Sequence, residues 1–224
     1  MGKVYALSDL HGQGNLWEQI KTFLKPDDMV YFLGDAIDRG PNGFAIMKEI
    51  LLDHRFHYIR GNHEVLMREA IKHNKWNDAW DLWFYNGGEL TAKAWRADGG
   101  YLDWIYVINE MPLEMTYINT SNQIIHLSHA GFAFNYHPSD EEELIWDRKH
   151  FYDQTTPPAN EFIVHGHSPI PYLEKKLYKH NYTLKDGVLF YADNHKIDID
   201  NGCFHTHAIS LLNLDTFDVI QFKE

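Results

Sequence analysis

The chain has 224 residues, of which 44% are hydrophobic and 15% aromatic, so it is long and apolar enough for one sizeable α/β core and is not a disordered protein. Lysine and arginine number 20 against 32 aspartates and glutamates, and the formal net charge of −12 argues against a protein that tracks a nucleic-acid backbone. A single cysteine, Cys203, excludes an internal disulfide, and no apolar run predicts a signal peptide or a membrane span. We therefore expect one domain, residues 1–224, that is cytoplasmic and binds neither nucleic acid nor membrane.

The first 64 residues repeat one pattern, in which a short apolar run ends in a polar motif. The runs at 4–7, 29–33 and 56–59 are rich in Val, Tyr, Phe and Ile, as strands are, and apolar residues recur at the helical period between them. This βαβαβ order predicts parallel strands with right-handed crossovers. The motifs SDLHG, GDAIDRG and GNHE follow the three runs, so we expect them to meet at the carboxyl edge of one sheet, where ligands bind in such folds.

The remainder of the chain predicts a helical insertion and then further strands. Residues 65–110 are helical in tendency, and Trp76, Trp80 and Trp83 share one helical face, which favours a packed insertion over a lid that contacts substrate. The acidic run at 140–143 is expected to be a solvated surface. Further strands are expected at 124–127, 162–164, 188–191, 196–199, 208–212 and 219–222, forming a second sheet. The predicted fold class is therefore α/β, with two packed mixed sheets flanked by helices.

Residue types that bind divalent metals follow the predicted strands. Asp9 and His11 are two apart at a strand end and can face the same way. Two ions about 3.5–4 Å apart need a shared carboxylate, for which Asp35 is the candidate, and further Asp, Asn and His ligands. The candidate ligands are Asp9, His11, Asp35, Asn62, His129 and His167. Together these motifs predict a two-metal site for hydrolysing phosphate esters.

The same motifs carry a resemblance to a known family. In order they are D-x-H, G-D-x-x-D-R-G, G-N-H-E, an isolated His before a small residue, W-x-R, and G-H-[ST]-P followed by I-D-x-x-G, and they extend from Asp9 to Gly202. The chain resembles the phosphoprotein phosphatase branch of the calcineurin-like metallophosphoesterases, and within it the compact bacterial and phage lambda-type serine/threonine protein phosphatases. The resemblance implies a metallophosphoesterase fold, with hydrolysis of phosphoserine, phosphothreonine or similar esters by a hydroxide that bridges two metals.

The resemblance also implies a role for each candidate metal ligand. Asp9, His11 and Asp35 would hold the first ion. The second ion would be held by Asp35, Asn62, His129 and His167. Manganese is the expected metal, with iron or zinc as alternatives, because a shell of oxygen and imidazole ligands does not choose among them.

Four further residues would act on the substrate in such a site. His63 would be the general acid that protonates the leaving group, oriented by Asp38. Arg39 and Arg148 would hold phosphate oxygens, because a planar guanidinium gives two parallel hydrogen bonds. Without the resemblance, Arg148 would be interpreted as a surface residue paired with Asp147 or with the acidic run.

Alternatives to a protein phosphatase remain open at this stage. A dinucleoside-polyphosphate hydrolase, for example of diadenosine tetraphosphate, or a nucleotide hydrolase would use the same site. Symmetric diadenosine tetraphosphate hydrolases tend to have Ala in place of Asp38 and Asp in place of Glu64, so these two residues favour the protein-phosphatase branch. Pro169 stands where nuclease members have the second His of G-H-x-H, and WFYNGGELT at 83–91 does not discriminate. A catalytically silent interaction protein is disfavoured because no ligand is missing. The expected partner is a phosphorylated protein or a small phosphoester, and neither an oligomeric state nor a role for His165 is predicted.

Overall fold

The computed structural model describes residues 2–73, 77–132, 141–148, 151, 155–177 and 181–224, without the side chains of 174–177. Its first sheet has the strand order β11-β10-β1-β2-β3. Strands β1 (Val4–Leu7), β2 (Met29–Phe32) and β3 (Phe56–Tyr58) are parallel, and α1 (Gly14–Phe23) and α2 (Gly43–Leu52) connect them. The predicted βαβαβ unit is therefore confirmed.

The last two strands join the first sheet rather than the second, which corrects the predicted grouping. Strand β10 (Ala208–Asn213) pairs antiparallel with β1, and β11 (Val219–Lys223) pairs with β10. Every residue of β10 is buried. The unpaired edge of β1 explains this return, because a buried sheet edge needs partners for its backbone groups.

The second sheet has the order β4-β5-β6-β9-β8-β7. Four of its strands match predicted runs: β5 (Ile124–Ser128), β6 (Glu161–His165), β8 (Val188–Tyr191) and β9 (Lys196–Asp198). The other two, β4 (Glu114–Ile118) and β7 (Tyr182–Lys185), were not predicted. Both are edge strands, and β7 is exposed along its whole length, so neither has a buried apolar run in its sequence.

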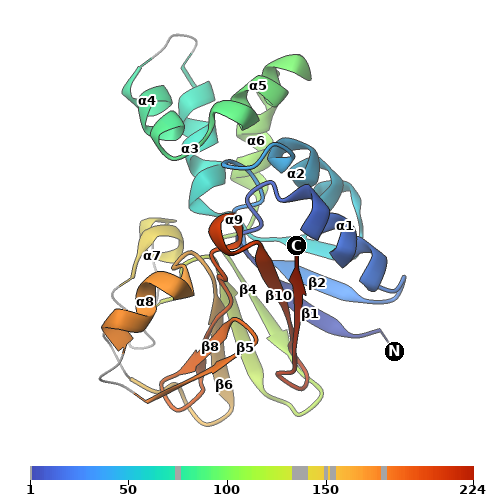
Figure 1. Cartoon of the computed structure of the whole chain (residues 1–224), viewed down its shortest axis with the longest axis vertical. Coiled ribbons are helices and arrows are strands. Elements are labelled where there is room, and N and C mark those ends of the chain that lie inside the picture. Colours follow the sequence, from blue (N-terminus) through green and yellow to red (C-terminus); the bar gives the residue numbers. More distant parts are fainter. Residues whose placement is uncertain (1, 74–76, 133–140, 149–150, 152–154, 178–180) are drawn as a thin grey trace.

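The two sheets pack face to face with helices on the outside (Figure 1). Side chains alternate along β1, so that Ala6 faces the second sheet while Tyr5 and Leu7 pack against α1 and α2. On the outer face of the second sheet, α7 (Glu141–Trp146) contributes Leu144 and Ile145 to one apolar cluster and α8 (Ile170–Leu177) contributes to another. None of the helices in the described part of the chain has both the length and the apolar composition that a membrane span requires.

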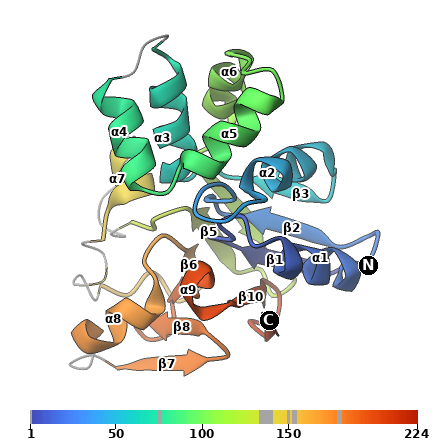
Figure 2. The same ribbon diagram turned by 45° about the horizontal axis from the view of Figure 1, so that its top comes forward.

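The described residues of the predicted helical insertion form four helices, gathered at one end of the molecule (Figure 2). They are α3 (Asn62–Ile71), α4 (Asp78–Tyr85), α5 (Glu89–Ala97) and α6 (Asp103–Glu110). Trp80, Trp83 and Trp95 pack together in its core, with ring centroids 5.5 Å apart for Trp80 and Trp83 and 6.2 Å for Trp80 and Trp95. Trp76 lies outside the described residues.

The acidic run is not a uniformly solvated surface. The Glu141 carboxylate accepts hydrogen bonds from Arg60 at 2.6 Å and from Arg68 at 2.8 Å. The same Arg60 guanidinium donates to the carbonyls of Asn109 and Met111 at the end of α6. Glu141 thus ties α7 to the insertion, whereas Asp140 lies outside the described residues.

Glu64 joins the segments that follow β2 and β3. Its carboxylate is fully buried and accepts four hydrogen bonds, from the backbone N–H of Asp35 at 2.9 Å, of Ala36 at 3.1 Å and of Gly61 at 2.9 Å, and from the Tyr58 hydroxyl at 2.8 Å. The Gly61 contact also caps the first turn of α3. This carboxylate therefore sets the relative position of two of the predicted site motifs.

Replacing Glu64 by Gln should destabilise the fold. The amide keeps the shape but turns an NH₂ group toward backbone donors, which should lower the free energy of unfolding by about 2–3 kcal/mol and Tm by roughly 5–10 °C. Thermal unfolding in the presence of a chelator measures this without a contribution from bound metal. Glu69→Gln, on the same helix but in an exposed ion pair with Lys72, is the control, and equal Tm values for the two variants would contradict the prediction.

Candidate metal centre

The predicted ligands lie just beyond the carboxyl ends of five strands. The residues that follow β1, β2, β3, β5 and β6 are Asp9, Asp35, Asn62, His129 and His167. Backbone hydrogen bonds join the first two segments, since the N–H of His11 donates to the carbonyl of Asp35 at 3.0 Å. Three of the segments come from the first sheet and two from the second, so the site lies where the two sheets meet beneath the helical insertion (Figure 1).

Much of this site has left-handed backbone geometry. Positive φ angles between 45° and 69° occur at Asp9, His11, Asp35, Asp38, Arg39 and His167. Side chains other than glycine rarely adopt this region, and the strain of about 1–3 kcal/mol per residue persists only where the surroundings fix it, most often at functional sites. The concentration of such residues at one edge of the fold marks this edge as a functional site.

Asp35 is the centre of the cluster. Two groups of possible ligand atoms contain it, one with His11 and His63 and the other with Asp9 and His129, and within each group the atoms lie within 4.8 Å of one another. His11 Nε2 is 3.7 Å from Asp35 Oδ2 and 3.9 Å from Asp9 Oδ1, while His129 Nε2 is 3.5 Å from Asp35 Oδ1. The two oxygens of one carboxylate therefore face two different sets of donor atoms.

Hydrogen bonds on the outer side of two imidazoles orient them for metal binding. His11 Nδ1 lies 3.0 Å from the carbonyl of Ile37, and His129 Nδ1 lies 2.6 Å from the carbonyl of Leu33. A carbonyl only accepts, so both rings donate through Nδ1 and carry a lone pair on Nε2. Both Nε2 atoms face the cluster, which is the tautomer that a metal ligand needs.

The amide of Asn62 lies between two further imidazole nitrogens. Its Oδ1 is 2.8 Å from His129 Nε2 and 3.0 Å from His167 Nδ1. His129 Nε2 carries a lone pair, so an acceptor faces an acceptor at hydrogen-bonding distance. In addition, His167 Nε2 is buried without a hydrogen-bond partner among the residues that the structure describes. A cation among these atoms removes the conflict, so the donor set fits divalent metal ions.

Burial controls the charge of these groups. It lowers the pKa of His11 and of His167 well below the usual value, aided by Arg39 at His11 and by His129 at His167, so both rings stay neutral. It raises the pKa of Asp35 well above the usual value, and the nearby carboxylates of Glu64 and Asp9 add to the rise. A buried cluster that resists negative charge in this way is stabilised by positive charge.

His63 and Asp38 form a buried pair beside the cluster. His63 Nδ1 donates to Asp38 Oδ2 at 2.7 Å, and the Arg39 guanidinium donates to His63 Nε2 at 3.1 Å. Burial lowers the pKa of His63 and raises that of Asp38 to about 7, and contacts of Asp38 with Thr91 and Trp83 oppose the rise. The structure therefore brings together His63, Asp38 and Arg39.

Arg148 reaches the same site from the end of α7. Its guanidinium donates to the backbone carbonyl of His167 at 3.2 Å. Leu144 and Ile145 of α7 are buried, and the Trp146 ring packs edge-on against the His167 ring with centroids 5.9 Å apart. The guanidinium of Arg148 therefore lies beside His167, one of the candidate ligands.

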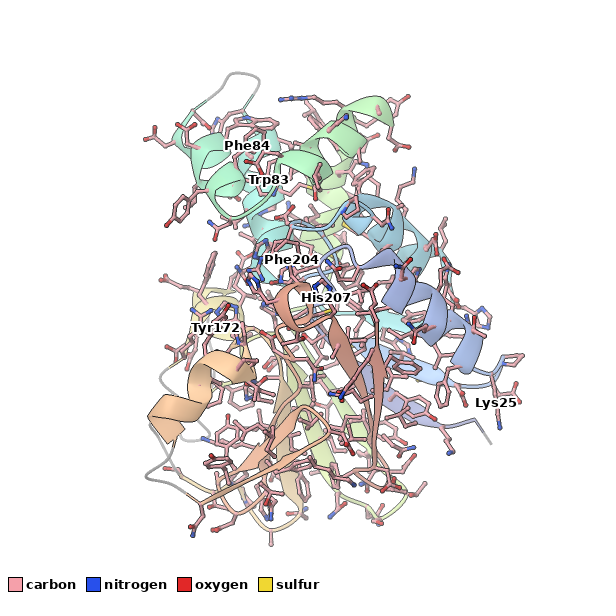
Figure 3. All side chains as sticks on the ribbon, viewed as in Figure 1. Lys25, Trp83, Phe84, Tyr172, Phe204 and His207 are labelled. Carbon is pink, nitrogen blue, oxygen red and sulfur yellow. The ribbon has the colours of Figure 1, made fainter. Side chains whose placement is uncertain are left out.

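Several contacts of the site were not anticipated from the sequence. Ser8 donates to Asp9 Oδ2, and Trp83, far away in the sequence, donates to Asp38 through its indole nitrogen. Figure 3 shows Trp83 in the helical insertion. His165 has a structural environment, since it is fully buried with Nε2 2.8 Å from the Tyr191 hydroxyl, and burial lowers its pKa to about 3.

The chain is similar in sequence to several phosphatases. Serine/threonine-protein phosphatase 2 of Escherichia coli is 26% identical over 153 residues, which cover 64% of this chain and 66% of that protein. Serine/threonine-protein phosphatase 1 of Salmonella typhimurium is 22% identical over 153 residues, which cover 65% of this chain and 68% of that protein. The match to the E. coli protein thus spans just under two thirds of its length.

Solved structures share the fold at low sequence identity. A putative diadenosine tetraphosphatase superposes with a TM-score of 0.62 at 14% identity, covering 99% of this chain and 93% of that one. A protein serine/threonine phosphatase from Saccharomyces cerevisiae gives 0.61 at 16% identity, covering 100% of this chain and 80% of that one.

The family pattern described as calcineurin-like phosphoesterase matches residues 2–208, nearly the whole chain. Together with the phosphatase names of the relatives, this match indicates a hydrolase that uses divalent metals, in agreement with the donor set at the sheet edge. The chain belongs to the calcineurin-like phosphoesterase family.

Proposed function

We propose that this protein is a dinuclear metal-dependent phosphomonoesterase that hydrolyses phosphoserine- and phosphothreonine-type esters in the cytoplasm. The observation that carries the proposal is the position of Asp35, whose two carboxylate oxygens face two separate groups of buried ligand atoms. His63, in one of these groups, is paired with the Asp38 carboxylate, and Arg39 and Arg148 contact His63 and His167. Metal ligands, a proton donor and phosphate-binding cations are the parts that phosphoester hydrolysis requires.

We assign the metal ligands as the sequence motifs suggest. Asp9, His11 and Asp35 would hold one ion, and His11 Nε2 lies 3.9 Å from Asp9 Oδ1 and 3.7 Å from Asp35 Oδ2. The other ion would be held by Asp35, Asn62, His129 and His167. When bound, the two ions supply Lewis-acid stabilisation of phosphoryl oxygens and a water-derived nucleophile at neutral pH. We propose Mn²⁺ as the metal, with Fe or Zn as alternatives.

The two arginines that bind the phosphate come from distant parts of the sequence. Arg148 is held by the carbonyl of His167, and Arg39 by the ring of His63. Both guanidinium groups keep further N–H donors for phosphate oxygens. When a phosphate draws Arg39 toward its oxygens, the contact with His63 Nε2 is exchanged, and this nitrogen becomes free to meet the ester oxygen.

Once Arg39 has left Nε2 of His63, this nitrogen takes up a proton from solvent, and His63 as an imidazolium then donates that proton to the leaving alkoxide while Nδ1 keeps its own. Its Nδ1–H is held by Asp38 at 2.7 Å, so the ring cannot rotate and Nε2 points toward the cluster, 3.8 Å from Asp35 Oδ2. Asp38 also stabilises the imidazolium form, because its charge lies next to the ring. An alkyl ester has a poor leaving group, and general acid catalysis of this kind typically contributes about 10²–10⁴-fold.

A second candidate function, hydrolysis of a dinucleoside polyphosphate or nucleotide, is favoured by a pocket beside Arg39. The pocket has a volume of about 480 Å³, within the range of small-molecule sites. Tyr85 of the insertion lines it, together with Tyr172 and Phe204 (Figure 3) from the opposite side. Such rings can stack on a base. The structural similarity to a putative diadenosine tetraphosphatase supports the same candidate.

The first prediction for this function concerns metal and substrate together. Excess chelator should abolish hydrolysis of a phosphoserine peptide, and Mn²⁺ should restore it. On the reconstituted enzyme, kcat/KM for the peptide should exceed that for diadenosine tetraphosphate by at least about tenfold, which corresponds to roughly 1.4 kcal/mol. Full activity in chelator without retained metal would overturn the mechanism, and the opposite substrate order would favour the second candidate.

His63→Asn should separate proton donation from metal binding. We expect kcat on a phosphoserine peptide to fall by about 10²-fold or more with two metals still bound, and to fall less on p-nitrophenyl phosphate, whose leaving group needs less protonation. His57→Asn, on β3, is the matched control and should retain activity. Equal losses on the alkyl and the aryl ester would argue against His63 as the acid.

Arg148→Ala should weaken phosphate binding without loss of metal. Removing a charge-assisted contact costs about 1.5–3 kcal/mol, so kcat/KM should fall roughly 10–100-fold, chiefly through KM, and inhibition by free phosphate should weaken. Arg148→Lys should restore only part, since a point charge lacks the guanidinium fork. Arg55→Ala, just before the amino end of β3, is the control. Unchanged phosphate inhibition in Arg148→Ala would remove this residue from the site.

A further inference from the structure

The segment 83–91, which links α4 to α5, is bonded directly to Asp38 and Arg39. The indole nitrogen of Trp83 donates to both carboxylate oxygens of Asp38, at 3.1 Å and 2.9 Å. The backbone N–H of Asp38 donates to Thr91 Oγ1 at 2.9 Å. The backbone N–H of Arg39 donates to the carbonyl of Gly87, also at 2.9 Å. The helical insertion therefore contacts the reacting side of the site through three of its residues.

These contacts support backbone that is otherwise unfavourable. Asp38 and Arg39 have φ angles of 69° and 64°, in the left-handed region that such residues rarely adopt. Their N–H groups point away from the regular ladders of the sheets and would be unsatisfied in this buried place without Thr91 and Gly87. The insertion thus helps to fix the local conformation that points the Asp38 and Arg39 side chains toward His63.

The two glycines of the segment permit this close approach. Gly87 has a φ angle of 97°, and a Cβ placed on it would lie 3.0 Å from Cγ of Arg39. A Cβ on Gly88 would lie 2.5 Å from the indole ring of Trp83. The chain therefore turns tightly over the indole, which leaves the ring fully buried with its N–H directed at Asp38.

Asp38 has few donors to replace these partners. Its carboxylate is fully buried and receives hydrogen bonds from His63 on one oxygen and from Trp83 on both. With the indole N–H in place, the carboxylate plane is fixed and the oxygen that faces His63 stays aligned. Without it, a buried charge would lose one of its two side-chain donors, and the ring of His63 would lose a fixed partner.

We propose that Trp83 and Thr91 are positioning residues for leaving-group protonation, which they support by holding Asp38 against His63. This inference rests on the proposed function, because it assigns the two residues to the proton-donating step of that reaction. It also gives the motif WFYNGGELT a chemical reason, since its first and last residues and Gly87 all meet the segment that carries Asp38 and Arg39, and Gly88 allows the chain to pass close to the Trp83 indole.

A packing role for Trp83 makes a different prediction from a positioning role. The ring also contacts Trp80 and Phe84, with centroids 5.5 Å and 5.9 Å away, so its loss could simply loosen the insertion. Trp83→Phe keeps an aromatic ring and removes the N–H. Trp95→Phe is the matched control, because Trp95 belongs to the same aromatic core and donates its indole N–H to the carbonyl of Tyr101 instead.

The experiment compares wild type, Trp83→Phe, Thr91→Val and Trp95→Phe, all reconstituted with Mn²⁺. For Trp83→Phe we expect kcat on a phosphoserine peptide to fall by about 10-fold or more, and kcat on p-nitrophenyl phosphate by less than about 3-fold. Thr91→Val should show the same selectivity, and Trp95→Phe should lose little on either ester. Tm and metal content, measured on each variant, identify a variant that has not folded. If Trp83→Phe does not fold, the loss of kcat on the two esters in Thr91→Val decides the test.

A double-mutant cycle with Asp38→Asn tests whether Trp83 acts through Asp38. In the Asp38→Asn background, Trp83→Phe should change kcat on the peptide by less than about 2-fold, because the partner that it positions is already altered. Equal losses on both esters in the single variants, or additive losses in the cycle, would overturn the inference. A wild-type enzyme without metal-dependent phosphatase activity would instead refute the proposed function, so the two failures are distinguishable.

Discussion

The structure depends on the burial of many hydrogen-bond acceptors around one carboxylate. Asp9, Asp35, Asn62 and His129 are each at most 3% exposed, and the atoms that they direct to the centre are oxygens and imidazole lone pairs. Such a cluster is unfavourable unless cations and backbone donors compensate it. The backbone N–H groups of His63 and His167 supply part of the compensation, donating to Asp35 and to Asp9 at 3.0 Å each. The remainder is left for divalent metal ions.

This requirement explains why the surrounding segments are held from several directions. Asp35 is fixed through its own N–H by Glu64, whose carboxylate also binds the segment before α3. Glu64 is itself buried and coupled by charge to Asp35, so its negative charge raises the need for positive charge nearby. The left-handed residues of the site lie in loops that Glu64 and the strands constrain, which is how a strained backbone can persist in a stable fold.

Sequence patterns predicted the buried centre of the fold far better than its edges. Strands β1, β2, β3 and β5 are apolar runs that end in polar motifs, and the parallel order of β1, β2 and β3 follows from the helices between them. Strands β4 and β7 have no such pattern because they lie at sheet edges and face solvent. The hydrogen bond from the Trp83 indole to Asp38 could not be predicted either. Aromatic residues at helical spacing look the same in the sequence whether they only pack in a core or also donate a hydrogen bond to a residue 45 positions away. Its one signal was the unexplained motif at 83–91.

In the segment 83–91, the helical insertion has a buried side and an exposed side that differ in their contacts. Trp83 and Thr91 are buried and face Asp38, whereas Tyr85 and Leu90 are exposed and line the pocket beside Arg39. In the proposed function, this arrangement lets the buried side of one segment support the proton donor while its exposed side chains lie at the pocket next to Arg39. Substitutions on the exposed side would then alter substrate preference without disturbing the buried contacts to Asp38. Under that proposal, the choice between a phosphopeptide and a nucleotide is assigned to the exposed side chains of the insertion, and the metal ligands need not change.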